Sequence, residues 1–271
     1  MNQVDIVFVV LVYRNFADLK DLKESIQSNV DCTSKVVVVD AYYDDSTSST
    51  IREYAKNNNY EYLLIENKGY GYGNNIGIKF AMEHFDFQYI VVCNPDTIIK
   101  TNISIKQLKR SGSCIAPRII TSRGKNQNPF WPYKSKLIEL LMYLGYKHDL
   151  ISLVYLGVLI NKLYRLIFFI ANRNSNLPRI YACHGSFLIM SKEIVSKNFK
   201  YDDEMFLFFE EAVHAYLMDC KNAPIIYDKN IKVYHKEDGS MSLVNFEEYP
   251  YLKQSYMYYY NEYNLNKTKE R

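Results

Sequence analysis

Two hydrophobic periods alternate over the first hundred residues of the chain. Runs dominated by apolar residues, which are typical of strands buried in a parallel sheet, occur at residues 6–12, 35–40, 62–65 and 87–93. Between these runs, apolar residues recur at helical spacing among charged ones, and the third such helix is expected at residues 75–85. Strands and helices in this order imply right-handed crossovers and a mostly parallel sheet. The pattern therefore predicts an α/β fold.

The second half of the chain is less regular. Residues 134–171 are predicted to form one or two helices, and residues 180–190 return to strand character. A helix is expected at residues 205–221, and two strand segments follow at residues 225–227 and 231–235. The regular alternation of the first half is therefore not continued here.

Composition and charge narrow the class of protein. The formal net charge is +3, from 33 basic and 30 acidic side chains, which is too balanced for the basic face of a nucleic-acid-binding protein. The five cysteines form no C-x-x-C pair and no metal-binding spacing, so we expect reduced thiols in a cytoplasmic protein. The N-terminal residues lack the basic and apolar regions of a signal peptide, which agrees with that expectation.

Residues 150–171 are the most apolar segment. An apolar run is interrupted at Asn161, Lys162 and Arg165, and a membrane span needs about 20 continuous apolar residues. We therefore do not predict a transmembrane helix. Two interpretations stay open for residues 134–171, which are either a basic amphipathic surface suited to the anionic cytoplasmic leaflet or the core helices of a large subdomain.

Polar residues follow two of the predicted strands, at the edge where α/β sheets bind ligands. Asp40 ends the second strand, where its carboxylate could accept hydrogen bonds from a ribose or a base, or belong to a turn and helix cap. Asn94-Pro95-Asp96 ends the fourth strand. A carboxylate there can hold a hard cation, although the same tripeptide is also typical of a simple turn.

Residues 66–77 (ENKGYGYGNNIG) form a glycine-rich segment before the third helix. Gly69, Gly71 and Gly73 would let the backbone approach a ligand closely, with a helix N-terminus following. A dinucleotide-binding fingerprint is disfavoured, because Asn74 stands where the third glycine belongs and the unit is third, not first, in the sheet. We expect a ligand-binding loop of another kind.

Two further motifs carry groups able to transfer protons or bind metals. Glu210 and Glu211 follow a strongly apolar run, and a carboxylate at an apolar wall has a raised pKa, as a general base needs. Adjacent helical residues diverge by about 100°, so the two acids cannot share one role. His235 ends the last strand, where it could bind a metal or phosphate or be purely structural.

Taken in order, these motifs resemble the family 2 glycosyltransferases of the GT-A fold, and within them the rhamnosyltransferase-like enzymes of bacterial polysaccharide assembly. The resemblance covers roughly residues 4–240 and is carried by six motifs in sequence. They are Val39-Asp40, Asn67-x-Gly69 leading to Gly73-Asn74-Asn75-x-Gly77, Asn94-Pro95-Asp96, His184-Gly185-Ser186-Phe187-Leu188-Ile189, Asp203-Glu204-x-Phe206-x-x-Phe209-Glu210-Glu211 and Val233-Tyr234-His235.

The resemblance implies a division of the chain and a donor site. Residues 1–100 would form a nucleotide-sugar-binding half with a mostly parallel sheet. Residues 101–240 would form a mixed metal and acceptor-side half with a helical insert at about 134–171, and residues 241–271 a C-terminal helical tail. The donor would be a nucleotide-diphosphate sugar. Its expected contacts are Asp40, Asn67, Gly69, Gly73, Asn74, Asn75 and Asn94.

The resemblance also implies a metal and a base. Asp96 would occupy the last position of the family's D-x-D metal motif and hold Mg²⁺ or Mn²⁺, with His235 nearby. The paired acids match a motif that usually reads Glu-Asp, so Glu211 is the expected base and Glu210 its partner. Val213-His214 departs from the usual acidic continuation. The Q-x-x-R-W motif of processive synthases is absent, which favours transfer of a single sugar.

The implied reaction is an inverting sugar transfer to a hydroxyl group. In the family the acceptor is commonly a lipid-linked oligosaccharide of O-antigen or capsule assembly, which places such an enzyme in the cytoplasm or at the inner face of the cell membrane. Two alternatives remain. One is a catalytically silent homologue that binds a nucleotide sugar or a partner, and the other is a nucleotidyltransferase, which would be expected to carry a basic glycine-rich loop after the first strand.

Overall fold

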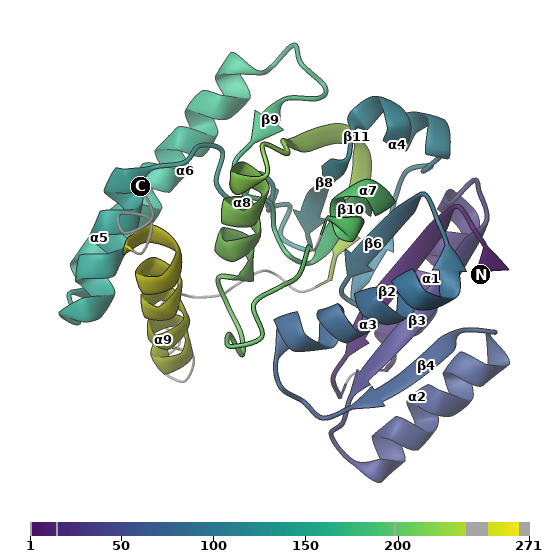
Figure 1. Cartoon of the computed structure of the whole chain (residues 1–271). Helices are drawn as coiled ribbons and strands as arrows, with labels where there is room; N and C mark the ends of the chain where they lie inside the picture. Colours follow the sequence, from purple (N-terminus) through teal and green to yellow (C-terminus); the bar gives the residue numbers. More distant parts are fainter. Residues whose placement is uncertain (1, 15, 198, 237–248, 266–271) are drawn as a thin grey trace.

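The computed structural model describes residues 2–14, 16–197, 199–236 and 249–265, and Figure 1 shows their arrangement. The strands are β1 (Asn2–Gln3), β2 (Ile6–Val12), β3 (Ser34–Ala41), β4 (Glu61–Ile65), β5 (Phe85–Asp86), β6 (Tyr89–Cys93), β7 (Thr97–Ile99), β8 (Cys114–Thr121), β9 (Arg179–Ile180), β10 (Phe187–Ser191) and β11 (Ile225–His235). The helices are α1 (Asp18–Asn29), α2 (Asp45–Asn57), α3 (Tyr70–His84), α4 (Ile105–Ser111), α5 (Lys136–Lys147), α6 (Ile151–Ala171), α7 (Lys192–Ser196), α8 (Glu210–Cys220) and α9 (Tyr249–Tyr259), and a π-helical turn follows at Tyr260–Leu265.

A mixed sheet of nine strands forms the centre of the fold. Its order is β4-β3-β2-β6-β10-β8-β11-β7, with β9 also bonded to β11. Four neighbouring strands from the first hundred residues, β4, β3, β2 and β6, are parallel to one another, whereas β10 runs antiparallel to both β6 and β8. The predicted α/β fold with a parallel first half and a mixed second half is confirmed.

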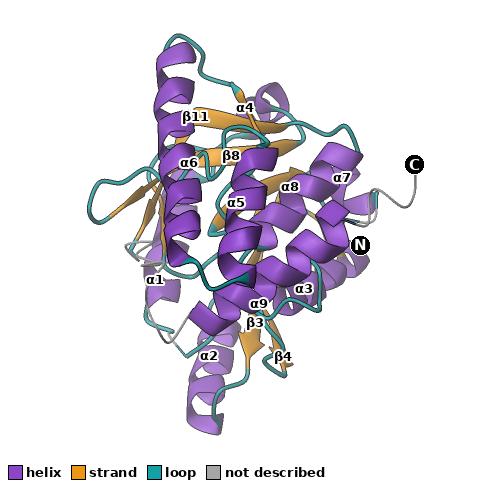
Figure 2. Cartoon of the chain, turned by 90° about the vertical axis from the view of Figure 1, so that its left-hand side faces the viewer, coloured by secondary structure: helices purple, strands orange, loops and turns teal. Residues whose placement is uncertain are grey.

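Both faces of the sheet are covered, as the continuous apolar runs of its strands require. Alternate residues of β2 point to opposite sides, so Val7 and Val9 pack with α3 while Phe8 and Val10 pack with α1, α2 and α4. A third apolar cluster joins α5, α8 and α9 outside the sheet. Figure 2 shows these outer helices in front of the sheet when the molecule is viewed from that side.

Several predicted boundaries are shifted. The third helix begins at Tyr70 rather than at residue 75, so most of the glycine-rich segment is helix rather than loop. The helix expected at 205–221 begins at Glu210, and the strand expected at 180–190 consists of β9 and β10 separated by a turn. The predicted tail contains α9, while residues 241–248 and 266–271 lie outside the described part of the chain.

The insert is an antiparallel pair of helices, α5 and α6. The polar residues that interrupt the apolar run of α6 do not break the helix, which continues for 21 residues and is long and apolar enough, by length and composition alone, to cross a membrane. Its inner side packs on α5, where Gly145 and Gly157 allow close approach to Val154 and Met142. Figure 1 places α6 along the outer edge of the molecule.

Glycines let α3 pack closely against the sheet. A Cβ atom at Gly73 would lie 2.4 Å from Leu11 Cδ1, and one at Gly77 would lie 2.4 Å from Val9 Cγ1 and 2.8 Å from Val39 Cγ2. Glycine is a poor helix former, and for that reason the glycine-rich segment is predicted to be a loop. Close packing against the sheet nevertheless holds it in a helix. The short distance between α3 and β2 holds the start of this helix at the ligand-binding edge of the sheet.

We predict that Gly77→Ala destabilises the fold by about 1–3 kcal/mol, the usual cost of overpacking a core. Denaturant unfolding of the purified protein measures the change. Gly157→Ala is the matched control, because the nearest atom to its new Cβ is the flexible Met142 Cγ at 3.1 Å, and it should cost less. Equal stability of Gly77→Ala and the wild type would contradict the close packing described here.

Candidate active site

A cavity of about 780 Å³ lies at the carboxyl ends of the parallel strands. Four of the predicted site residues, Asn67, Gly69, Asn94 and Asp96, line it together with Pro95. This is the place where open α/β sheets bind ligands, and its volume falls within the range of about 300–1,000 Å³ seen for ligand pockets. Segments far apart in the sequence also contribute to its wall, among them Phe206, Lys236 and Tyr251.

Asp96, which lines this cavity, forms a pair with the buried His235. His235 Nδ1 lies 2.8 Å from Gln127 Oε1, and His235 Nε2 lies 3.2 Å from Asp96 Oδ2. With the ring proton on Nδ1, which would then donate to Gln127, Nε2 carries a lone pair and has no hydrogen-bond partner among the described residues. An imidazole lone pair and a carboxylate oxygen that lie this close together are both groups that bind divalent metal ions. The two side chains therefore fit a metal ion.

The metal would not be enclosed by protein ligands alone. No group of three or more His, Cys, Asp or Glu side chains with the geometry of a metal site occurs among the described residues. Nearby His184 stays neutral, because burial and the neighbouring His235 and Arg165 lower the pKa of its imidazole to about 3. Further ligands would have to come from water or a bound diphosphate.

A short segment connects the Asp96 region to the acid pair. The backbone N–H of Asn94 donates to the Ser186 carbonyl at 2.9 Å, and the N–H of Gly185 donates to Glu211 Oε1 at 3.0 Å. The Tyr70 hydroxyl, on the cavity wall, donates to the Gly185 carbonyl at 2.8 Å. The histidine-glycine-serine motif thus lies between the predicted metal residue and the predicted base.

The two glutamates occupy the first turn of α8. Phe208 and Phe209 adopt positive φ angles of 74° and 65°, and this turn directs the chain into the helix. Both carboxyl groups are enclosed, and burial raises the pKa of Glu210 and of Glu211, with repulsion from Glu211 raising that of Glu210 further. Glu210 Oε1 has no hydrogen-bond partner among the described residues, whereas Glu211 is held by Gly185. Neither side chain lines the cavity itself.

Four predicted donor residues are engaged in structural contacts instead of facing the cavity. Asp40 is 1% exposed and accepts a hydrogen bond from the Tyr62 hydroxyl at 2.7 Å. Gly73 packs on β2, and Asn74 is fully buried with its amide nitrogen donating to the Tyr70 carbonyl.

The fourth of these residues, Asn75, connects α3 to the loop before α8. Its side chain exchanges hydrogen bonds with the Tyr201 backbone and donates to the Asp203 carboxylate. Of this segment, Asn67, Gly69 and Tyr70 line the cavity, whereas Gly73, Asn74 and Asn75 lie further along the packed helix.

Two basic groups near the strand ends, of which Lys236 lines the cavity, were not identified from the sequence. The Arg14 guanidinium lies over the rings of Tyr13 and Tyr43, 4.9 and 4.3 Å from their centroids, beside the ends of β2 and β3. Lys236 lines the cavity and forms ion pairs with Asp18 and Asp21 on α1. The signal was present, since aromatic and basic residues directly follow two predicted strand ends, but it does not distinguish a ligand-binding cluster from an ordinary loop.

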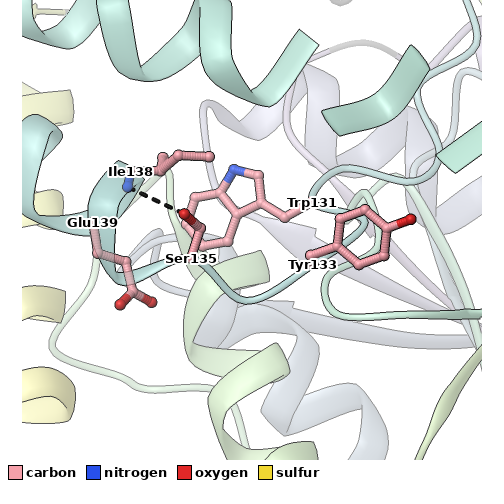
Figure 3. A pocket seen from close by; sticks show the side chains of 5 residues that line it. All are labelled: Trp131, Tyr133, Ser135, Ile138 and Glu139. Carbon is pink, nitrogen blue, oxygen red and sulfur yellow. Dashed lines mark hydrogen bonds between the residues drawn. The ribbon is translucent and has the colours of Figure 1, made fainter. Parts of the chain in front are cut away.

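A second hollow lies beside the start of α5. Trp131, Tyr133, Ser135, Ile138 and Glu139 surround it, and the Ser135 hydroxyl accepts from the Ile138 N–H to cap the helix (Figure 3). Its volume of about 10 Å³ holds no more than a single water molecule. The cavity at Asp96 is therefore the candidate active site.

Comparison with known proteins locates this architecture among glycosyltransferases. No family model matches the chain. The low-salt glycan biosynthesis hexosyltransferase Agl10 of Haloferax volcanii is 24% identical over 227 residues, which are 82% of this chain and 64% of Agl10. The chain thus spans somewhat less than two thirds of that curated relative.

Solved structures agree on the fold. TarS of S. aureus in complex with UDP has a TM-score of 0.55 at 12% identity, with 86% of this chain and 60% of that one covered. GalNAc-T7 with UDP, GalNAc and Mn²⁺ has a TM-score of 0.58 at 13% identity, covering 86% of this chain and 44% of that one. The chain has the GT-A fold. At these identities the GT-A match concerns architecture alone, and the subgroup expected from the sequence stays a prediction.

We predict that Glu210→Gln stabilises the protein at pH 8–9. A carboxyl group whose pKa is raised by folding contributes full stability below its unfolded pKa and loses it as the pH rises through the folded value. Glutamine removes that buried charge, and each kcal/mol regained is worth about 2–4 °C in melting temperature for a domain of about this size.

Thermal unfolding at pH 5 and pH 8.5 checks this prediction, with the gain confined to the higher pH. Exposed Glu193, which is paired with Lys197, is the control, and Glu193→Gln should gain nothing at either pH. A loss of stability in Glu210→Gln at pH 8.5 would show that the carboxylate has a partner that balances its charge.

Proposed function

We propose that this protein is an inverting glycosyltransferase that moves a single sugar from a nucleotide-diphosphate sugar to an acceptor hydroxyl. The observation that carries the proposal is the cavity at the carboxyl edge of a GT-A sheet, lined by Asp96, whose carboxylate lies 3.2 Å from a His235 Nε2 that has no hydrogen-bond partner among the described residues. A hexosyltransferase relative supports the reaction class. The UDP complexes of TarS and GalNAc-T7 support a nucleotide-linked donor.

The donor would bind across the strand ends. Asn67, Gly69 and Asn94 line the cavity and are proposed to contact it directly. Asp40, buried one residue before Ala41 on the cavity wall, would act from behind that wall, with its carboxylate held by Tyr62. Gly73, Asn74 and Asn75 would act indirectly, by holding α3 and the loop before α8 in place.

Mg²⁺ or Mn²⁺ is the proposed cofactor, held by Asp96 and His235. When bound, such an ion neutralises charge on the departing nucleoside diphosphate. The Mn²⁺ in the GalNAc-T7 structure supports this choice. Asp96 supplies the hard oxygen ligand, and His235 supplies a ring nitrogen whose other side is fixed by Gln127, an arrangement that orients a metal-binding imidazole.

The acid pair is proposed to activate the acceptor. Glu211 would remove the hydroxyl proton as that oxygen attacks the anomeric carbon, and a single displacement inverts the configuration at that carbon. Gly185 fixes the carboxylate by donating to it, and burial keeps the pKa of Glu211 raised. A raised pKa makes a stronger base, which is useful near neutral pH.

The proposed acceptor is an oligosaccharide in cell-surface polysaccharide assembly, carried on a lipid at the inner face of the cell membrane. The support is the sequence resemblance to rhamnosyltransferase-like enzymes of O-antigen and capsule assembly. The exposed rings of Tyr13, Phe206 and Tyr251 on the cavity wall also suit a sugar acceptor, because amphipathic rings pack against sugar faces.

One observation favours a second candidate, a catalytically silent homologue that binds a nucleotide sugar. Neither glutamate reaches the cavity surface, and Val213-His214 replaces the acidic continuation of the motif. His214 is itself buried between Cys114 and Cys183, with ring-nitrogen to sulfur distances of 3.9 and 3.8 Å. Activity measurements on the variants below separate the two candidates.

We predict that Mn²⁺ binds weakly to the free protein and more tightly when UDP is present, since the protein supplies few ligands. Electron paramagnetic resonance of free Mn²⁺ measures both affinities. Asp96→Asn should weaken the UDP-dependent binding at least about tenfold, because it removes the anionic ligand. Exposed Asp86, which pairs with Lys192, is the control, and Asp86→Asn should bind as the wild type does. Unchanged binding in Asp96→Asn would remove Asp96 from the metal site.

We predict that Glu211→Gln lowers hydrolysis of nucleotide sugars by about 10²–10⁴-fold, the usual contribution of a general base. Hydrolysis of a donor panel with Mn²⁺ is the assay, with Glu193→Gln as the control. In the wild type, kcat/KM should rise with pH through a value above the ordinary glutamate range, since the base works only when deprotonated. Equal activity in Glu211→Gln and wild type would defeat the assignment, and no activity in either would favour the silent homologue.

A further inference from the structure

An exposed apolar stripe runs along the outer face of α6. Its side chains recur three and four residues apart, which places them on one side of a helix. They are Leu156, Leu159, Leu163, Leu166 and Ile170, between 43% and 64% exposed. Leu137 and Leu140 on α5 and Leu150 between the helices are also exposed. A contiguous apolar surface of this kind marks a site of interaction in a soluble fold.

The opposite face of α6 is fixed to the protein. Val154, Gly157 and Phe168 are buried there. The Asn161 side chain donates to the Phe130 carbonyl at 3.0 Å, and the Arg165 guanidinium donates to the Asn126 carbonyl. A helix crossing a bilayer alone would have to give up these hydrogen bonds, which is costly in hydrocarbon. The stripe therefore meets its partner from one side, with α6 lying flat on the fold.

The charges around the stripe are basic. Lys136, Lys147, Lys162 and Arg173 are exposed on or next to the two helices, and α6 contains no acidic residue. The two acids in this region do not offset them. Glu139 is buried, and Asp149 pairs with Lys253 at 2.6 Å.

We propose that the outer face of α5 and α6 docks on the surface of an anionic lipid bilayer, with α6 parallel to the membrane plane. Apolar side chains would enter the acyl boundary while the lysines and arginine reach the headgroups, the arrangement of an interfacial amphipathic helix. A second copy of the chain fits less well, because two such faces would bring Lys162 and Arg173 of both copies together with no carboxylate on α6 to pair them.

The inference goes beyond sugar transfer and rests on this surface alone. The docking surface would hold the protein at a membrane, and this proposal would stand even if the catalytic roles of Asp96 and Glu211 were wrong. It would also account for the long exposed helix, which lies on the outer edge of the molecule (Figures 1 and 2).

Co-sedimentation of the full chain with vesicles tests the docking. The vesicles contain phosphatidylcholine with or without about one third phosphatidylglycerol. The wild type should pellet with the anionic vesicles, less with the neutral ones, and less again at high salt. The double variant Leu159→Glu/Leu166→Glu should lower the bound fraction about tenfold or more, because two apolar side chains no longer enter the bilayer.

Matched controls separate the surface from general effects. Leu64→Glu replaces another exposed leucine, on β4, and Lys56→Glu, on α2, is compared with Lys162→Glu on α6. Both control variants should bind as the wild type does, and all variants should keep the wild-type circular dichroism and vesicle-free donor hydrolysis.

Three outcomes would overturn the proposal. In the first, the wild type stays in the supernatant with anionic vesicles. In the second, the Leu159→Glu/Leu166→Glu variant binds the vesicles as well as the wild type does. In the third, the wild type is a dimer that does not bind vesicles, and the same double substitution converts it to a monomer. The third would assign the face to a second copy. Loss of hydrolysis with vesicle binding intact would instead count against the sugar-transfer proposal alone.

Discussion

The antiparallel pairing of β6 with β10 is the contact on which the candidate site depends. Its register places Phe187 opposite Cys93, and the same ladder continues as the Asn94 N–H bonds to the Ser186 carbonyl. One residue earlier, Gly185 donates to Glu211. Backbone hydrogen bonds thus set the relative positions of the metal-side strand end and the acid pair, and a slip of one residue would turn each side chain to the other face of the sheet.

Around that contact the fold retains polar groups whose burial costs free energy. The paired acids of α8 are enclosed with raised pKa values, and His235 Nε2, beside a carboxylate, has no hydrogen-bond partner among the described residues. Each would be more stable as an apolar or neutral side chain. The two groups are joined through Gly185 and Ser186 beside the cavity, which suits the proposed roles in proton transfer and cation binding, and the apolar packing of the GT-A sheet supplies the compensating stability.

Much of the fold and part of the site could be predicted from local patterns. Buried parallel strands can be recognised in the sequence as apolar runs. Because Asp96 follows one of these runs, its place at the cavity depends only on where that strand ends. The glycine-rich segment shows where local reasoning fails. Glycine at positions 73 and 77 lowers helix propensity, yet both belong to α3, because close packing against Leu11 and Val9 decides their conformation. Asn74 and Asn75 are drawn into that packing with them.

By itself, the sequence determined the α/β order, the residues at the strand ends and the apolar, basic character of the insert, because these depend on neighbours in the chain. The tertiary structure alone decided which distant groups meet. It paired His235 with Asp96, enclosed Asp40 beneath Tyr62, and turned one side of α6 inward while leaving a leucine stripe outside. The spacing of hydrophobic residues determines whether a segment forms a helix or a strand. Which other segment packs on each face of that helix or strand depends on the register and packing of residues far apart in the chain.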